Sequence, residues 1–158
     1  AIGVRPPNWS GPVVSLGWEQ FVVVLPPNDP LAGRAGAVAL RDLADRSWIL
    51  YEPSQGLADY VATACALAGF RPRKAVLTSQ VQAAVRLAAA GLGAVLVPSA
   101  NVPEQLAHTA RTLEPPVAWE LTVFARSALS APAAAFVELL SRGPMASLPA
   151  HAVVLPGG

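Results

Sequence analysis

The apolar run from Phe21 to Leu25, which two prolines close, is the feature that most limits what this chain can fold into. Its three successive valines favour a strand, because β-branched side chains pack well on a pleated sheet. The run shows no alternation of apolar and polar residues, and a continuous apolar strand is typical of a sheet covered on both faces. The sequence therefore predicts a buried strand at 21–25 inside a layered domain.

Strand-like and helix-like segments alternate along the rest of the chain. Apolar residues at helical spacing predict one helix between the turn at 52–56 and Gly69, and a second helix that Ser79 caps and Gly91 closes. A final helix is expected at 133–140, and short helical pieces are expected at 41–44 and 102–106. Further strands are expected at 1–4, 13–16, 48–51, 73–77, 94–97, 109–113 and 119–125. This order predicts an α/β fold with a mostly parallel sheet.

The composition excludes several classes of function. The 158 residues carry 11 Lys+Arg against 10 Asp+Glu, so the chain lacks the basic excess that nucleic-acid binding requires, and we do not expect these residues to touch DNA. Polar residues and prolines interrupt every apolar stretch before the ~20 uninterrupted residues of a membrane span are reached. No signal peptide is expected at Ala1, and the one cysteine is compatible with a reducing cytoplasm.

The sequence shows no catalytic constellation. His108 and His151 lie beside no credible nucleophile, and Cys65 falls on the apolar face of its helix, where an inert buried thiol is expected. One cysteine and two distant histidines do not make a zinc site. Gly91 and Gly93 mark a helix-to-strand junction, whereas a phosphate loop needs a strand-to-helix junction. We therefore expect no enzyme, no cofactor and no metal.

Two turns carry small hydroxyl residues between a strand and a helix. Ser54 follows Pro53 in one turn, and Ser79 follows Thr78 in the other. In open α/β sheets ligands bind beyond the carboxyl ends of the strands, where helix N–H groups favour a polar or anionic group. Both turns are expected on one side of the sheet as candidate ligand-binding positions. The sequence gives equal weight to the alternative that Ser79 only caps its helix.

A series of short motifs keeps a fixed order and spacing from about Ala1 to Arg142. It comprises FVVVLP at 21–26, DPLA at 29–32, LRDLA at 40–44, GFRP at 69–72, RLAAAGLGAVLVP at 86–98, and SAP at 130–132 followed by Phe136. This series resembles the effector-binding domain of LysR-type bacterial transcriptional regulators. The resemblance covers about nine tenths of the chain.

The resemblance implies a type-2 periplasmic-binding-protein-like fold, in which two crossing strands join two subdomains and a small effector binds between them. Residues 1–17 and 118–142 would form an incomplete first subdomain, and 18–117 the second subdomain with a hinge strand at each end. Residues 143–158 are expected to be a flexible tail, in which 152–155 could add an edge strand. The winged helix-turn-helix of the family has no counterpart in these residues, so DNA would be bound only through that missing domain. A cytoplasmic homodimer or homotetramer is implied.

The resemblance also implies roles for single positions in effector binding. Thr78 and Ser79 match one effector-contacting turn of the second subdomain, and Pro53 and Ser54 match the other. Trp18 falls on the first crossing strand.

For two of these positions the role stays open between a functional and an ordinary one. Trp18 either forms a wall of the cleft or packs the hinge. Arg5 follows the first strand, where it either meets an anionic effector or is an ordinary strand-end residue.

Two other classes of protein share the two-lobe fold. A solute-binding receptor of a transport system would need an export signal. An enzyme such as a deaminase or dehydratase would need a catalytic carboxylate or nucleophile at the cleft, which the two turns do not supply. The sequence thus predicts an effector-sensing domain for a small polar or carboxylated molecule. It does not indicate which molecule, which target genes, or whether they are activated or repressed.

Overall fold

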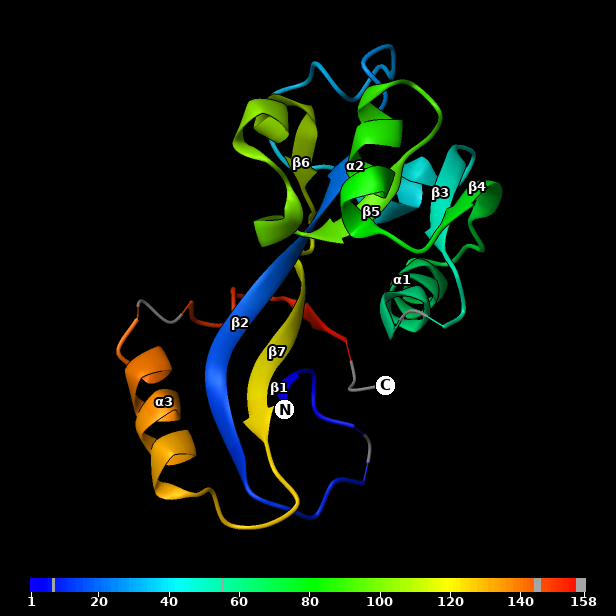
Figure 1. Ribbon diagram of the computed structural model, residues 1–158. Coiled ribbons are helices and arrows are strands. Elements are labelled where there is room, and N and C mark those ends of the chain that lie inside the picture. The colour runs from blue at the N-terminus through cyan, green and yellow to red at the C-terminus, as the bar shows by residue number, and fades with distance from the viewer. Residues whose placement is uncertain (7, 55, 144–145, 156–158) are drawn as a thin grey trace.

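One long strand runs from a lower lobe into an upper one, and a second strand pairs antiparallel with its lower part and leads from the upper lobe back to the lower one (Figure 1). The computed structural model describes residues 1–6, 8–54, 56–143 and 146–155. The crossing strands are β2 (Val13–Val24) and β7 (Val117–Phe124), and they pair from Val13 with Phe124 to Gln20 with Ala118. The sequence predicted two separate strands at 13–16 and 21–25, and β2 joins them into one continuous strand.

In the upper lobe a two-stranded sheet of β4 and β3 lies beside the strands β5, β2 and β6 of the larger sheet. The strands of this lobe are β3 (Ser47–Tyr51), β4 (Arg73–Thr78), β5 (Val95–Pro98), β6 (Ala110–Thr112) and the end of β2. Strands β3 and β4 pair in parallel, and a parallel bridge from Trp48 to Ala94 connects β3 to the start of β5. The helices of this lobe are α1 (Gly56–Leu67) and α2 (Val81–Ala89), with short 3-10 helices η1 (Leu40–Leu43), η2 (Ser99–Asn101) and η3 (Glu104–Thr109).

The predicted α/β class is confirmed, but the sheet is parallel only in part. Strands β3, β4 and β5 run in parallel, as the βαβ spacing predicted. Strand β2 is antiparallel to β5, β6 and β7. The reason is that β2 enters the upper lobe from the lower one, at the edge where β3, β4 and β5 end (Figure 1).

The core of the upper lobe lies around the end of β2. All five residues from Phe21 to Leu25 are buried, which confirms the prediction of a strand covered on both faces. They pack in one cluster with Trp48, Val61 and Val85, which β3, α1 and α2 contribute. The ends of β3, β4 and β5 form the edge that faces the lower lobe (Figure 1).

Two glycines close the helices as predicted, whereas the predicted cap does not form. Gly69 and Gly91 both have positive φ, and each follows its helix as the left-handed residue of a Schellman motif. The prediction that Ser79 caps α2 is wrong, because α2 begins at Val81 and Gln80 occupies the N-cap position without a side-chain cap. The Thr78 hydroxyl oxygen instead accepts a hydrogen bond from the Gln80 N–H, at 3.2 Å.

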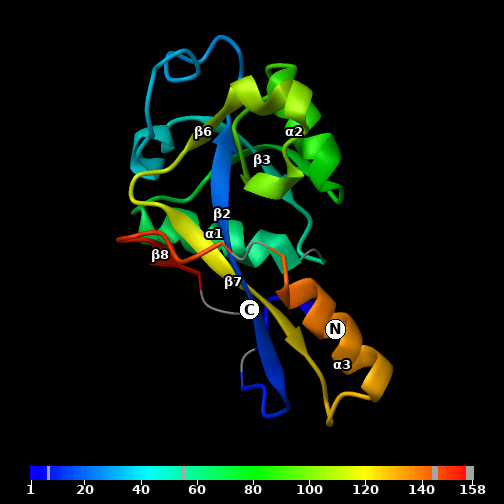
Figure 2. The same cartoon turned by 90° about the vertical axis from the view of Figure 1, so that its left-hand side faces the viewer.

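The lower lobe consists of the outer halves of β2 and β7 with three smaller elements. Strand β1 (Ile2–Gly3) pairs antiparallel with β7, β8 (Val153–Val154) pairs parallel with it, and α3 (Ala131–Ser141) packs beside β2 (Figure 2).

The described part of the C-terminal segment lies along the crossing strands. The Ala146 carbonyl accepts the Trp18 N–H at 3.0 Å, the Val153 N–H donates to Pro116 at 2.7 Å, and Leu155 is buried. The short edge strand that the sequence allowed at 152–155 is thus present as β8. The contacts place 146–155 against the hinge, whereas the sequence predicted a flexible tail, and the division of the chain into subdomains stays a prediction.

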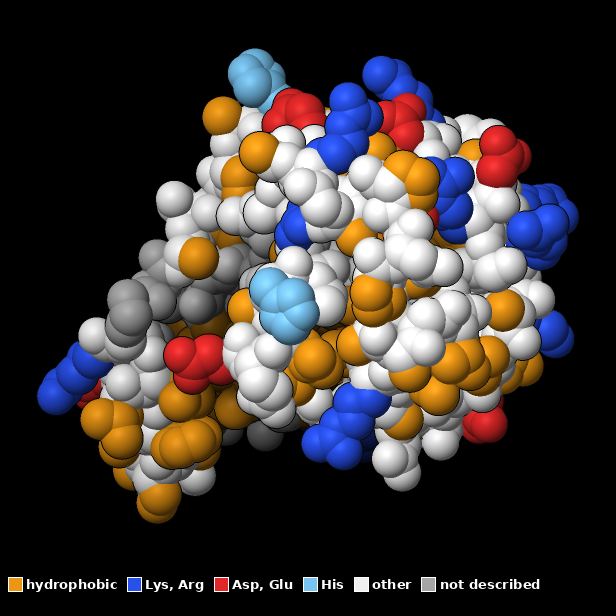
Figure 3. All heavy atoms as spheres, turned by 90° about the horizontal axis from the view of Figure 1, so that it is seen from above, with side chains coloured by type: hydrophobic (Ala, Val, Ile, Leu, Met, Phe, Trp, Pro, Cys, Tyr) orange, Lys and Arg blue, Asp and Glu red, His pale blue; other side chains and the backbone are white. Residues whose placement is uncertain are grey.

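Charged side chains on the upper lobe are mixed. On the face shown in Figure 3, Lys and Arg side chains are spread among Asp and Glu rather than gathered in one patch. This distribution agrees with the net charge of +1.

Candidate functional site

The pairing of β3 with β4 brings the two predicted turns together. Tyr51 lies opposite Thr78 at the ends of the two strands, and the Glu52 N–H donates to the Thr78 carbonyl at 3.1 Å. Pro53 and Ser54 therefore follow β3 beside the place where Thr78 and Ser79 follow β4. We call these four residues the turn edge.

The polar groups of the turn edge differ in exposure and in whether they form hydrogen bonds within the protein. Pro53, Ser54 and Ser79 are exposed, and Thr78 is half-buried. The Thr78 hydroxyl oxygen is engaged by Gln80, whereas the Ser79 hydroxyl makes no hydrogen bond to any described residue. Ser79 thus offers a donor and an acceptor to a ligand without giving up a contact of the fold.

A hollow of about 390 Å³ lies between the two lobes. Its walls come from the end of β1 in the lower lobe, from the first two turns of α1 in the upper lobe, and from the crossing strand β7. The lining residues are Val4, Pro6, Gly56, Leu57, Asp59, Tyr60 and Trp119. We call it the inter-lobe hollow. Because both lobes contribute walls, a change in the angle between them changes its shape.

Trp119 forms the floor of this hollow. Its ring makes edge-to-face contacts with Phe21 and Tyr60, each with 5.0 Å between ring centroids. Its Nε1 donates to Oε2 of Glu19 at 3.1 Å, and Oε1 of Glu19 accepts the Ala100 N–H at 3.2 Å. Such aromatic pairs hold a ring in place beyond the effect of burial alone.

The structure places the two remaining predicted residues apart from the turn edge. Arg5 is exposed; its chain neighbours Val4 and Pro6 line the inter-lobe hollow, but Arg5 itself does not. Trp18 lines a second, shallow hollow of about 470 Å³ with residues that include Glu19 and Ser99.

None of the six predicted residues lines the inter-lobe hollow itself, and sequence reasoning missed the residues that do. Trp119 was expected only as a member of a strand, and Tyr60 and Leu57 only as the apolar face of a helix. The one signal that could have pointed to Trp119 was an aromatic residue just after the predicted hinge, which ended at 117.

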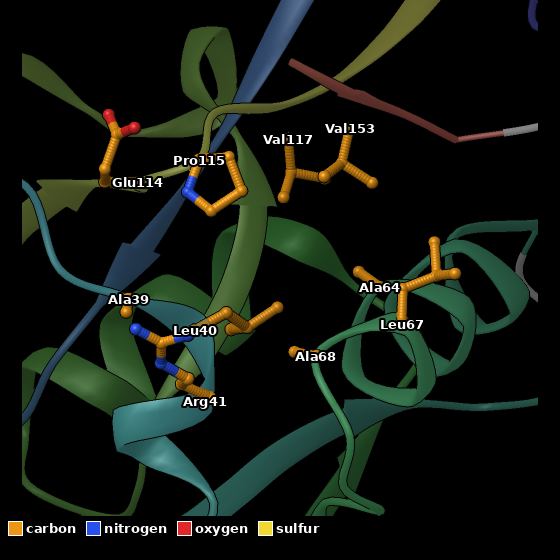
Figure 4. Close-up of a pocket in the computed structure, with 10 residues that line it drawn as sticks. All are labelled: Ala39, Leu40, Arg41, Ala64, Leu67, Ala68, Glu114, Pro115, Val117 and Val153. Carbon is orange, nitrogen blue, oxygen red and sulfur yellow. The ribbon is translucent and has the colours of Figure 1, made fainter. Parts of the chain in front are cut away.

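A third, separate pocket opens at the other end of α1 (Figure 4). It has a volume of about 280 Å³ and apolar walls from Leu40, Ala64 and Val117, with Arg41 and Glu114 at its margin. It contains none of the predicted site residues. The pocket is therefore distinct from the inter-lobe hollow.

Metal-ligating side chains are not clustered in the described residues, and the Cys65 thiol is buried. No group of three or more His, Cys, Asp or Glu side chains among them is arranged to hold a metal ion. Burial raises the pKa of the Cys65 thiol to about 12, so the thiol stays protonated at neutral pH and is not a nucleophile. No helix in the described ranges is long and apolar enough to cross a membrane.

Two α/β lobes, two crossing strands and a ligand-sized hollow between the lobes define a type-2 periplasmic-binding-protein-like domain. The family described as LysR substrate binding domain matches residues 1–144, and the chain belongs to that family. This match confirms the family that the motif series resembled and does not favour the transport receptor.

Solved structures of LysR-family regulators share the fold. The effector binding domain of QuiR in complex with shikimate superposes with a TM-score of 0.72 at 23% identity, covering 90% of this chain and 69% of that one. The C-terminal domain of a probable LysR family transcriptional regulator from Rhodococcus gives 0.68 at 28% identity, covering 85% and 68%. The Synechocystis CcmR regulatory domain in complex with 2-PG gives 0.73 at 19% identity, covering 92% and 74%.

A curated relative from Mycobacterium avium carries the name probable hydrogen peroxide-inducible genes activator. It is 34% identical over 92 residues, which are 58% of this chain and 29% of the relative. The chain thus matches less than a third of the length of that relative.

Proposed function

We propose that this chain is the effector-sensing part of a transcriptional regulator and that a small molecule binds in the inter-lobe hollow. The observation that carries the proposal is that both lobes and a crossing strand line this one hollow. Because these residues carry no basic excess, DNA would be bound by a separate domain of a longer protein, and that domain would respond to effector binding.

A hinge between the lobes supplies the mechanism. The pairing of β2 with β7 shifts register between Ser15 and Gly17, and Gly17 has a φ of 107°. Such a bulge lets a strand pair bend locally. An effector shifts the equilibrium between two lobe angles only by the difference between its affinities for them, so it must contact the walls of both lobes.

The walls indicate the chemistry of the effector. Trp119, Tyr60 and Leu57 offer an apolar floor. The turn edge, which does not line the hollow but includes the residues just before the start of α1, offers hydroxyl and backbone groups, and Arg5, next to Val4 in the chain, stays a predicted contact for a negative charge. A small molecule with one apolar face and a polar or carboxylated end fits this distribution. The ligands in the titles of two structural neighbours, shikimate and 2-PG, make small polar molecules a reasonable starting point.

A peroxide-sensing thiol is the alternative that the name of the curated relative raises. Sensor cysteines need an accessible thiolate. Cys65 is the only cysteine of the 158 residues, and it is buried with a pKa raised to about 12. These properties favour a bound effector over thiol oxidation within this chain.

Three further parts of the proposal follow from the family. The domain binds its effector without converting it, as its membership of the LysR substrate binding domain family implies. The regulator acts in the cytoplasm, where its target DNA lies. It assembles as a homodimer or homotetramer.

The proposal is tested by thermal unfolding of the chain with shikimate, 2-PG and a panel of small carboxylates and polyols. A ligand present at a hundredfold excess over its dissociation constant raises stability by ~2.7 kcal/mol, which is a clear shift in the unfolding midpoint. Binding that survives Trp119→Ala and Ser79→Ala unchanged would place the site elsewhere and count against the proposal. A panel in which no compound shifts the midpoint would count against it as well.

A further inference from the structure

Glu19 stands where the two crossing strands enter the upper lobe. Its two carboxylate oxygens accept hydrogen bonds from different elements: Oε1 from the Ala100 N–H in η2 and Oε2 from the Trp119 indole in β7. Glu19 and Trp119 are also direct partners in the pairing of β2 with β7. One half-buried side chain on β2 therefore joins the other crossing strand to the segment that follows β5.

The bond to Glu19 fixes what Trp119 presents to the inter-lobe hollow. An indole has a single N–H, and Trp119 donates it to Glu19. The contacts with Phe21 and Tyr60 hold the same ring from two sides. Trp119 is thus held in one orientation, and it offers the hollow ring carbon rather than a hydrogen-bond donor.

The point where the strands bend lies just below Glu19. Leu16 is the extra residue of the bulge, and Gly17 is two positions before Glu19. Above the bulge, Glu19 ties the strand pair to the upper lobe. Below it, β1 carries Val4 into the wall of the hollow. Bending at the bulge therefore moves the lower wall relative to Trp119.

We propose that Glu19 is the positioning residue of the inter-lobe hollow. It holds Trp119 fixed relative to the upper lobe, as a rigid floor of the hollow. A bound effector then contacts a floor that does not move and a lower wall that moves when the angle between the lobes changes. This inference rests on the proposed function, because it assigns a role within the same hollow. It also makes a claim about the ligand-free protein that can be tested alone.

The first test observes Trp119 directly in the ligand-free chain. The protein has four tryptophans, so labelling with 5-fluorotryptophan gives four ¹⁹F signals, and Trp119→Phe assigns one of them. In Glu19→Ala the Trp119 signal should move and broaden while the signal of buried Trp48 stays in place. Glu19→Gln keeps one acceptor oxygen and should give a smaller change. The Glu120 side chain makes no hydrogen bond or ion pair with any described residue, so Glu120→Ala is the matched control and should leave Trp119 unchanged.

The second test measures the angle between the lobes. Spin labels on Ala66→Cys in α1 and Ala134→Cys in α3, both exposed helix positions, report the inter-lobe distance in a Cys65→Ala background. Glu19→Ala should widen the distance distribution, and Glu120→Ala should not. A Trp119 signal and a distance distribution that stay as in the parent protein when Glu19→Ala folds normally would overturn the inference.

A third measurement separates positioning from general stability. If Glu19 acts through Trp119, the effect of Glu19→Ala on the inter-lobe distance distribution should be largely absent when Trp119→Phe is already present. Additive effects would contradict the inference. Failure of the proposed function would show instead as an absence of ligand binding, and it would leave these ligand-free results unaffected.

Discussion

The backbone carbonyl oxygen of Ser47 lies 2.7 Å from the position that a Cβ on Gly93 would occupy. The same carbonyl accepts the Ala94 N–H at 2.8 Å, and this bond joins β3 to the start of β5. Gly93 also has a φ of 155°, which residues with a side chain rarely adopt, so Gly93→Ala should both strain the backbone and push the two strands apart, and it should lower the free energy of unfolding by about 2–3 kcal/mol. Chemical denaturation measures the loss.

Gly33 provides the control for this substitution. A Cβ at Gly33 would meet no heavy atom within 4 Å, and its φ is not positive. Gly33→Ala should change the free energy of unfolding by less than about 1 kcal/mol, with a gain possible because alanine restricts the unfolded chain. Equal losses at the two positions would show that the contact with Ser47 is not the cause.

The ion pair between Asp29 and Arg46 should stabilise the loop that follows β2. The Asp29 side chain is only 5% exposed; its Oδ2 accepts from the Arg46 Nε at 2.7 Å, and its Oδ1 accepts the Leu31 N–H at 2.9 Å. Asp29→Ala leaves both donors without their acceptor and should cost about 1–3 kcal/mol in urea denaturation. Asp42→Ala, at an exposed pair 4.0 Å from Arg41, should cost less than about 0.5 kcal/mol.

Stability should fall at alkaline pH because of two buried acids. Burial raises the pKa of Cys65 from its ordinary value of 9.0 to about 12, and burial also raises the pKa of Tyr51. Above pH 9 the unfolded chain releases the thiol proton while the folded chain keeps it, so unfolding is favoured by about 1.4 kcal/mol per pH unit until the folded pKa is reached. This contribution is fully present below pH 9. In Cys65→Ala the free energy of unfolding should fall less steeply between pH 8 and 11 than in the parent protein. An unchanged pH dependence in that variant would contradict the assignment.

The Cys65 thiol should resist reagents that attack thiolates. The side chain is fully buried, and its raised pKa leaves almost no thiolate at pH 8. The folded chain should therefore react with a disulfide reagent only as fast as it opens, and the reaction should become immediate in denaturant. Rapid reaction of the folded chain with the disulfide reagent would revive the thiol-sensing alternative.

The elements that could be predicted from sequence are those whose signal is local. The valines at 21–25 and the glycines at 69 and 91 carry their own backbone preferences, and the structure uses them as expected. The predicted cap at Ser79 failed because Thr78, one residue earlier, provides the acceptor for Gln80. A hydroxyl pair offers two competing local bonds, and the sequence does not show which one forms.

The inter-lobe hollow was harder to predict because its parts are distant in the chain. Glu19 and Trp119 are 100 positions apart, and only the pairing of β2 with β7 makes them neighbours. The turn edge could be predicted because its residues follow two successive strands of one sheet. The floor of the hollow depends instead on the register of two strands that belong to both lobes, and local patterns do not contain that register.

Ser79 allows effector binding to be separated from folding. Its hydroxyl is exposed and makes no hydrogen bond to any described residue, so Ser79→Ala should leave the unfolding midpoint unchanged while it weakens effector binding by about 1–2 kcal/mol, close to tenfold in the dissociation constant. Thr78→Val should instead lower the unfolding midpoint, because it removes the acceptor of the Gln80 N–H and so destabilises the start of α2. Ser127→Ala, at an exposed serine of the lower lobe, is the matched control and should change neither quantity. The measurement is calorimetric titration of the parent protein and Ser79→Ala with the compound that raises the unfolding midpoint most. An unchanged dissociation constant in Ser79→Ala would show that the turn edge is not part of the binding site.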